Sequence, residues 1–166
     1  MDDDGAIIVG DYRYLLWRTW GGGNHARLLW IMLNPSTADE SQDDRTLDRC
    51  VSFSKRENYG GLEVVNLFAY RTPYPRKLRD VCDPIGSENT QHLKEAVQRA
   101  AACEAKVVVA WGAMSHEGIY KQQADIVLAR LKQCPEIHLY CLGKTVSGCP
   151  KHPCRLASNT DMSLYA

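Results

Sequence analysis

The chain has 166 residues, of which 45% are hydrophobic and 24% are charged, and its formal net charge at pH 7 is zero. This composition is typical of one globular domain spanning residues 1–166, and the balanced charge argues against a nonspecific coat for nucleic acid. The apolar runs are far shorter than a membrane span needs, and the start, Asp2-Asp3-Asp4, is unlike a secretory signal, so we expect a cytoplasmic protein.

The first half of the chain alternates strand and helix patterns. Strand formers over 12–20 indicate an edge or antiparallel strand, and the apolar run over 27–33 indicates a central one. A helix is predicted to begin after Asp44, which suits an N-cap, and to run to about Asn58. We expect Gly60-Gly61 to stop that helix.

The alternation continues through the second half. Further strands are predicted over 62–68, 106–111 and 137–142, with helices over 88–102 and about 119–133. Ser87 can cap the first of these helices, a short turn of helix is expected near Lys77, and the tail beyond Pro150 looks irregular. This order predicts an α/β fold, a three-layer α/β/α sandwich with a mainly parallel central sheet.

Polar or special residues follow four of the predicted strands. They are Asn34, Asn66, the pair Trp111-Gly112, and His152 beyond the last strand. Each has a plain explanation, since an Asn often completes a turn and a lone His is often a surface residue. The carboxyl ends of parallel strands share one sheet edge, however, so these residues are expected to meet at one cleft.

Charged and aromatic side chains near the same loops have two readings. The acidic run Asp39, Glu40, Asp43, Asp44 either caps a helix or supplies a carboxylate that orients a water or holds a metal. Basic residues beside two loops are either solvated or contact phosphates. Phe68 and Tyr70 either pack in the core or stack on a base. The basic residues are Arg71, Arg76, Lys77, Arg79, Lys144, Lys151 and Arg155.

The sequence lacks the usual cofactor signatures. Seven cysteines are present without the paired spacing of a zinc or iron–sulfur site, and we interpret them as buried hydrophobes and loop thiols. Gly143-Lys144-Thr145 lacks the upstream glycine and the following helix of a phosphate loop. We therefore expect no metal and no cofactor.

The motifs together resemble a bacterial family known as domain of unknown function 1643, over nearly the whole chain. They are Leu33-Asn34-Pro35-Ser36-Thr37-Ala38-Asp39, Asp43-Asp44-Arg45-Thr46, Val65-Asn66-Leu67-Phe68-Ala69-Tyr70-Arg71, Ala110-Trp111-Gly112 and Lys151-His152-Pro153.

The order of four short motifs also resembles the uracil-DNA glycosylase superfamily. These are Met32-Leu33-Asn34-Pro35, Val64-Val65-Asn66, Val108-Val109-Ala110-Trp111-Gly112 and His152-Pro153-Cys154. The resemblance implies that Asn34 holds the attacking water, that Asn66 reads the edge of an extruded base, and that His152 hydrogen-bonds the base carbonyl.

The leading hypothesis is a glycosylase that hydrolyses the N-glycosidic bond of a modified or damaged nucleobase. Its expected catalytic residues are Asn34, His152 and Asp39, its base-binding residues Asn66, Phe68 and Tyr70, and its nucleic-acid contacts Ser36, Thr37, Arg71, Lys144, Lys151 and Arg155. A donor aimed at the developing charge is worth about 3 kcal/mol, and an amide paired with a base edge discriminates by ~1–3 kcal/mol.

Two alternatives stay open at this point. One is a noncatalytic module that binds a nucleotide or nucleic acid through the same cleft. The other is a metal-dependent hydrolase or transferase that acts on a free nucleotide through the acidic run. In each case the expected partner is nucleic acid, with DNA favoured, or a nucleotide, and neither a membrane nor an obligate protein partner is expected.

Overall fold

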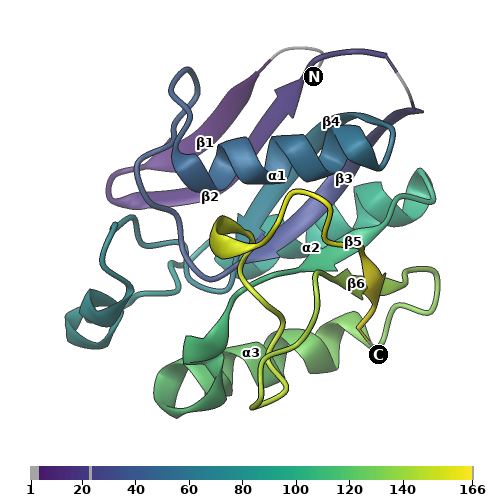
Figure 1. Ribbon diagram of the computed structural model, residues 1–166. Coiled ribbons are helices and arrows are strands. Elements are labelled where there is room, and N and C mark those ends of the chain that lie inside the picture. Colours follow the sequence, from purple (N-terminus) through teal and green to yellow (C-terminus); the bar gives the residue numbers. More distant parts are fainter. Residues whose placement is uncertain (1–3, 23, 166) are drawn as a thin grey trace.

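The computed structural model describes residues 4–22 and 24–165. Within them seven strands form one sheet in the order β1-β2-β4-β3-β5-β6-β7 (Figure 1). The strands are β1 (Gly5–Val9), β2 (Tyr12–Thr19), β3 (Asn24–Met32), β4 (Tyr59–Asn66), β5 (Val107–Val109), β6 (Leu139–Cys141) and β7 (Ser163–Leu164). The middle strands β4, β3, β5 and β6 are parallel, whereas β1, β2 and β7 are antiparallel to their neighbours. The predicted α/β fold with a parallel middle is confirmed.

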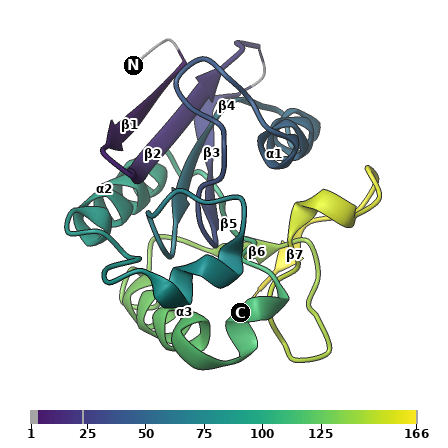
Figure 2. The ribbon, with the colours of Figure 1, turned by 90° about the vertical axis from the view of Figure 1, so that its left-hand side faces the viewer.

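Three α-helices connect the parallel strands: α1 (Arg45–Arg56), α2 (Asn89–Ala102) and α3 (Gly118–Leu131). The connection from β3 to β4 runs along the sheet in the opposite direction to the connections from β4 to β5 and from β5 to β6. Right-handed crossovers therefore put α1 on one face and both α2 and α3 on the other (Figure 2). None of the helices in the described part of the chain is long and apolar enough to cross a membrane.

Short 3-10 helices interrupt the loops that follow the parallel strands. They are η1 (Pro75–Asp80), η2 (Ala113–His116) and η3 (Pro153–Arg155). The first corresponds to the turn of helix predicted near Lys77. The third lies on the same side of the sheet as α1 (Figure 2), and this side carries the site described below.

The central strand and its covering helix follow from the sequence pattern. Residues 28–32 of β3 are all buried, as expected for a strand covered on both faces. Trp30 among them donates its indole N–H to Ser54 Oγ of α1 at 2.9 Å, so its polar atom is satisfied. Helix α1 begins as predicted, because Asp44 Oδ1 accepts the Leu47 N–H at 2.9 Å.

Three local predictions were wrong. Gly60 and Gly61 do not stop α1 but belong to β4, and α1 ends before Asn58, whose φ of 66° is left-handed. Ser87 does not cap α2, because Glu88 is the N-cap residue and makes no side-chain cap bond. The tail is not wholly irregular, since β7 pairs with β6.

Gly61 is required for close approach of two strands rather than for a turn. A Cβ built on Gly61 would lie 2.7 Å from the backbone oxygen of Arg18 on the neighbouring β2. We expect Gly61→Ala to lower the free energy of unfolding by about 1–3 kcal/mol, as overpacking does in a tight core. Urea denaturation measures this, with Ser52→Ala on the exposed face of α1 as control. Equal midpoints for the two variants would contradict the assigned close contact.

Candidate functional site

A pocket of about 250 Å³ lies at the carboxyl ends of β3 and β4. Its wall includes Asn34 after β3, Asn66 at the end of β4, and His152 just before η3. The loop of His152 is held beside β5, because the Gly112 N–H donates to the Pro150 oxygen at 2.9 Å. The crossovers that leave β3 and β5 run in opposite directions, and open α/β sheets bind ligands at such a switch point. The structure thus brings together three of the four features that were expected to meet. The fourth, Trp111-Gly112, does not line this pocket, and Trp111 lines a different one beside α3.

Asn66 supplies a side-chain amide that has no hydrogen-bond partner among the described residues. Its side chain is almost fully buried, and neither Nδ2 nor Oδ1 has a hydrogen-bond partner. Its backbone oxygen is anchored by Asn89, whose Nδ2 donates to it at 2.9 Å. An unpaired buried amide costs about 1–3 kcal/mol, and a ligand with a matching polar edge would offset this cost.

His152 supplies a hydrogen-bond donor in a defined tautomer. Its Nδ1 accepts the backbone N–H of Cys154 at 3.3 Å, so the ring proton is on Nε2. Burial lowers the pKa of His152 below its usual value, and the nearby Asp44 carboxylate only partly opposes this shift. At neutral pH the ring is therefore uncharged, with Nε2–H as the donor that it offers to the pocket.

The lowered pKa of His152 makes the stability of the fold depend on pH. The folded state resists protonation of this ring. The contribution of the neutral ring to the free energy of unfolding is therefore fully present above about pH 6.5, and it is lost as the pH falls through the lower folded-state pKa. We expect His152→Asn to reduce this loss of stability at acid pH. Above pH 8 the dependence of the free energy of unfolding on pH should be unchanged. Urea denaturation at a series of pH values measures both. If the free energy of unfolding depended on pH in the same way in both proteins, the lowered pKa would not belong to His152.

Asn34 and Asp44 complete the inner polar wall. Asn34 donates through Nδ2 to the backbone oxygens of Pro35 at 3.0 Å and Thr72 at 2.8 Å, which leaves its Oδ1 as an acceptor. Asp44 lines the same pocket while its Oδ2 accepts the Ala38 N–H at 3.2 Å. Sequence reasoning treated Asp44 as a helix cap or a metal ligand. It is both the cap of α1 and the carboxylate of this pocket.

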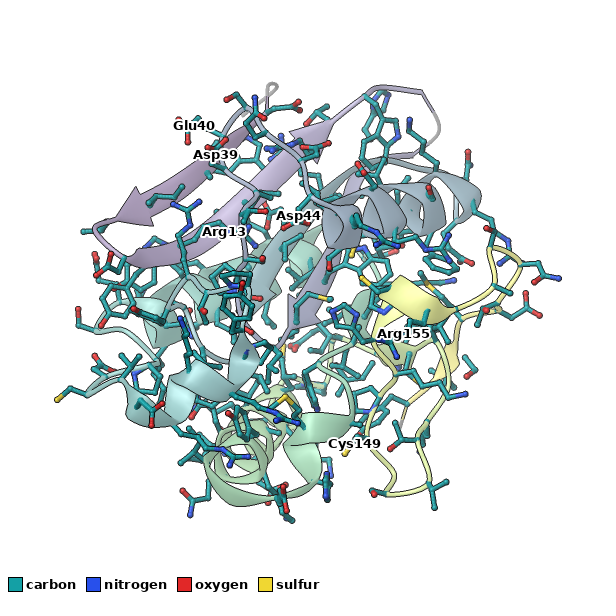
Figure 3. All side chains as sticks on the ribbon, turned by 60° about the vertical axis from the view of Figure 1, so that its left-hand side comes forward. Arg13, Asp39, Glu40, Asp44, Cys149 and Arg155 are labelled. Carbon is teal, nitrogen blue, oxygen red and sulfur yellow. The ribbon has the colours of Figure 1, made fainter. Side chains whose placement is uncertain are left out.

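Arg13 is a pocket residue that the sequence analysis missed. It extends from β2, is only 5% exposed, and donates through Nη1 to the Ala38 oxygen at 3.0 Å, while its Nε has no partner. Burial lowers its pKa to about 10, so the guanidinium is still charged at neutral pH. In Figure 3 Arg13 lies close to Asp44, near the start of α1. The available signal was a charged residue inside a strand that is otherwise largely apolar.

Helix α1 fixes the position of the His152 loop. Arg49 donates through Nε to the Pro153 oxygen at 3.4 Å and through Nη2 to the Leu156 oxygen. One turn earlier, Thr46 Oγ1 lies 3.1 Å from Cys154 Sγ. These contacts hold the imidazole of His152 on the α1 side of the sheet, opposite the ends of β3 and β4.

Three of the predicted catalytic and base-binding residues lie outside this pocket. Asp39 caps its own turn, where Oδ1 accepts the N–H groups of Ser41 at 2.9 Å and Gln42 at 2.8 Å, and these bonds lower its pKa. Figure 3 shows it beside Glu40, displaced from Asp44. Phe68 is buried with its ring edge-on to Tyr120, and Tyr70 packs edge-on against Tyr12. None of the three lines the pocket.

Of the predicted nucleic-acid contacts, Ser36 lines the pocket and the others do not. Thr37, Lys151 and Arg155 are exposed. Lys144 lies over the ring of Tyr165 with its Nζ 4.9 Å from the ring centroid. Arg71 is partly buried, with an Nε that has no partner.

The acidic run does not converge on one point. Asp39 caps a turn, Asp43 accepts a hydrogen bond from Arg18 Nε at 2.9 Å, and Asp44 caps α1. Across residues 4–22 and 24–165 no group of three or more His, Cys, Asp or Glu side chains is arranged to hold a metal ion. Cys50 also lines the pocket, but burial raises the pKa of its thiol, which disfavours a thiolate nucleophile there.

Comparison with known proteins identifies a family. The family model described as "Protein of unknown function (DUF1643)" matches residues 13–154, a range that contains every pocket residue named above. No curated protein and no solved structure matches the chain. The predicted family is therefore confirmed, while the wider resemblance to uracil-DNA glycosylases rests on motif order.

Proposed function

This chain belongs to the DUF1643 family, and we propose that it hydrolyses the N-glycosidic bond of a modified or damaged nucleobase in nucleic acid, with a fold of the uracil-DNA-glycosylase type. The observation that carries the proposal is the unpartnered, buried amide of Asn66 in one pocket with the neutral imidazole of His152. A side-chain amide matches the adjacent donor and acceptor on the edge of a base.

The proposed reaction breaks one bond and forms one. The bond between C1′ of the sugar and the base nitrogen breaks, and its electron pair goes to the base. Water adds to C1′ and gives up one proton to the solvent, and the departing base takes up a proton from the solvent at the nitrogen that held C1′. His152 Nε2–H would donate to a carbonyl of the departing base, where negative charge develops, and this kind of stabilisation is worth about 3 kcal/mol.

Water and sugar would meet the opposite wall of the pocket. Asn34 Oδ1 is an available acceptor for the attacking water, because Nδ2 already bonds the Pro35 and Thr72 oxygens. Asp44 supplies the negative charge that favours a cationic sugar at C1′. Asp44 thereby replaces Asp39 as the catalytic carboxylate of the proposal, because Asp39 does not line the pocket.

A base within a duplex must be turned out of the stack before it can enter such a pocket. The exposed Lys151 and Arg155 flank His152 and the start of η3, where they would contact the phosphates around an extruded nucleotide. The proposed polymer is DNA, because the motif order resembles that of uracil-DNA glycosylases. Phosphate contacts of this kind give affinity without base selectivity.

The test is release of a base from oligonucleotides that each contain one altered base, in single-stranded and duplex form. Abasic sites are detected by alkaline strand cleavage. We expect cleavage for at least one altered base, and loss of it in His152→Ala and Asn66→Ala, but not in His138→Ala, an exposed histidine outside the pocket. Absence of abasic sites across the panel would refute hydrolysis.

A noncatalytic nucleotide-binding module is the second candidate. It is favoured by the fact that both oxygens of Asp44 already accept backbone N–H bonds, which weakens the carboxylate as a base. A module of this kind would bind nucleic acid with strong salt dependence and would release no base.

A further inference from the structure

Arg13 is a buried cation without an anionic partner. Its side chain is 5% exposed, and it forms no ion pair with any described residue, in contrast to Arg18 on the same strand, which pairs with Asp43 at 2.9 Å. Nη1 bonds a backbone oxygen, whereas Nε bonds nothing. Burying a charge without a counter-charge is unfavourable, so its retention in a pocket wall calls for a ligand that compensates it.

A local irregularity in β2 directs Arg13 to this pocket. Ile7 of β1 pairs with Leu15 but the next residue, Ile8, pairs with Arg13, so Tyr14 is an extra residue in β2. Side chains alternate along a regular strand, which would put Arg13 on the opposite face from Leu16 and Arg18. The extra residue reverses this alternation, and β-bulges commonly re-aim a side chain beside a binding site.

The groups around Arg13 do not neutralise it. Asp44 is the carboxylate that acts most strongly on Arg13, but it forms no ion pair with it, and both of its oxygens are bonded to backbone N–H groups. Two further cations, Arg71 and Arg18, also act on Arg13 and lower its pKa. Around this guanidinium the Asp44 carboxylate thus faces two cations, Arg13 and Arg71, that form no ion pair with a described residue, so the local charge balance is positive.

We infer that Arg13 makes this pocket select a ligand that presents a negatively charged group, either an ionised planar heterocycle or a phosphate. The inference deepens the proposed function, since it concerns the same pocket. Arg13 Nε and the Asn66 amide are both buried without a partner, and both residues line this one pocket. A heterocycle that carries both the polar edge and the charge fits this better than a phosphate at the mouth.

The test is isothermal titration calorimetry of the whole protein with three small probes. Barbiturate is a planar pyrimidine anion at neutral pH, uracil is its neutral counterpart, and inorganic phosphate is a non-planar anion. We expect barbiturate to bind at least about tenfold more tightly than uracil, because charge-assisted hydrogen bonds are the stronger ones. Equal affinity of the wild-type protein for barbiturate and uracil, without phosphate binding, would overturn the inference.

Variants assign the preference to Arg13. Arg13→Gln is expected to abolish the preference for the anion, Arg13→Lys to keep part of it, and Arg130→Gln, an exposed arginine on α3, to leave it unchanged. Thermal unfolding checks that each variant folds. If Arg13→Gln does not fold, the Arg13→Lys variant and the wild-type comparison still decide. A preference that persists in folded Arg13→Gln overturns the inference.

The outcomes separate the two proposals. Barbiturate preference without base release supports the inference and refutes the glycosylase. Base release with equal affinity for barbiturate and uracil, and without phosphate binding, refutes the inference and leaves the glycosylase. Arg13-dependent binding of phosphate alone identifies phosphate as the anion and removes support for a base in the inner pocket.

Discussion

Replacing Asn66 by leucine is expected to raise the free energy of unfolding by about 1–3 kcal/mol and to abolish base binding. The two side chains have similar shapes, and the amide of Asn66 is buried without a partner for either polar atom. Removing it therefore removes a desolvation cost from the folded state, while the ligand loses the group that would read its edge. A gain in stability with a loss of binding distinguishes a ligand site from an ordinary buried residue.

Asn89 provides the matched control for this prediction. It is buried to the same degree, but its Nδ2 donates to the backbone oxygens of Asn66 at 2.9 Å and Leu67 at 3.2 Å. Asn89→Leu should therefore destabilise the fold, opposite in sign to Asn66→Leu. Urea denaturation of both variants measures the difference. If Asn66→Leu were as destabilising as Asn89→Leu, the amide of Asn66 would have a structural role and the base-reading role would fail.

Replacing His152 by alanine is expected to lower the rate of base release by ~10²–10³, the effect typical of removing a donor to a developing negative charge. The donor is Nε2–H of a neutral ring, since Nδ1 accepts the Cys154 N–H. The loss should therefore appear in the rate of the bond-breaking step more than in substrate affinity. Single-turnover kinetics with saturating enzyme separate the two quantities.

His152→Gln provides a sharper version of the same experiment. A glutamine amide can still donate a hydrogen bond, so partial recovery relative to alanine is expected if donation matters. His138→Ala, outside the pocket, should match the wild type. Equal rates for His152→Ala and the wild-type protein would remove His152 from the mechanism.

The fold was largely predictable because its signals are local. The buried run over 28–32 indicates a central strand, and Asp44 followed by an amphipathic pattern indicates the start of a helix. The strand β1 was not predicted, because its partly buried residues pair only with β2 at the edge of the sheet. Gly61 was misread, because close approach of the β2 backbone is a tertiary property that the glycine pair does not reveal.

The site was predictable where it depends on topology. Asn34, Asn66 and His152 line one pocket because parallel strands end at one edge of the sheet. Arg13 stands out as a charged residue in a largely apolar strand, but its place in the pocket was not predictable. Its side chain reaches the pocket through one extra residue in β2, and regular alternation gives the opposite face. Asp39 and Asp44 stand in the same acidic run, and only the fold decides that the second lines the pocket while the first caps a turn.

The pocket wall comes from positions as far apart as Arg13 and His152, in the antiparallel strand β2, the ends of the parallel strands β3 and β4, helix α1 and the loop before η3. Neither half of the polypeptide could assemble this recognition surface by itself. A bound ligand would connect these segments, so its binding energy would oppose global unfolding and also any local opening that separates one of them from the pocket. Occupancy of the pocket would thus report that the most distant parts of the chain have docked.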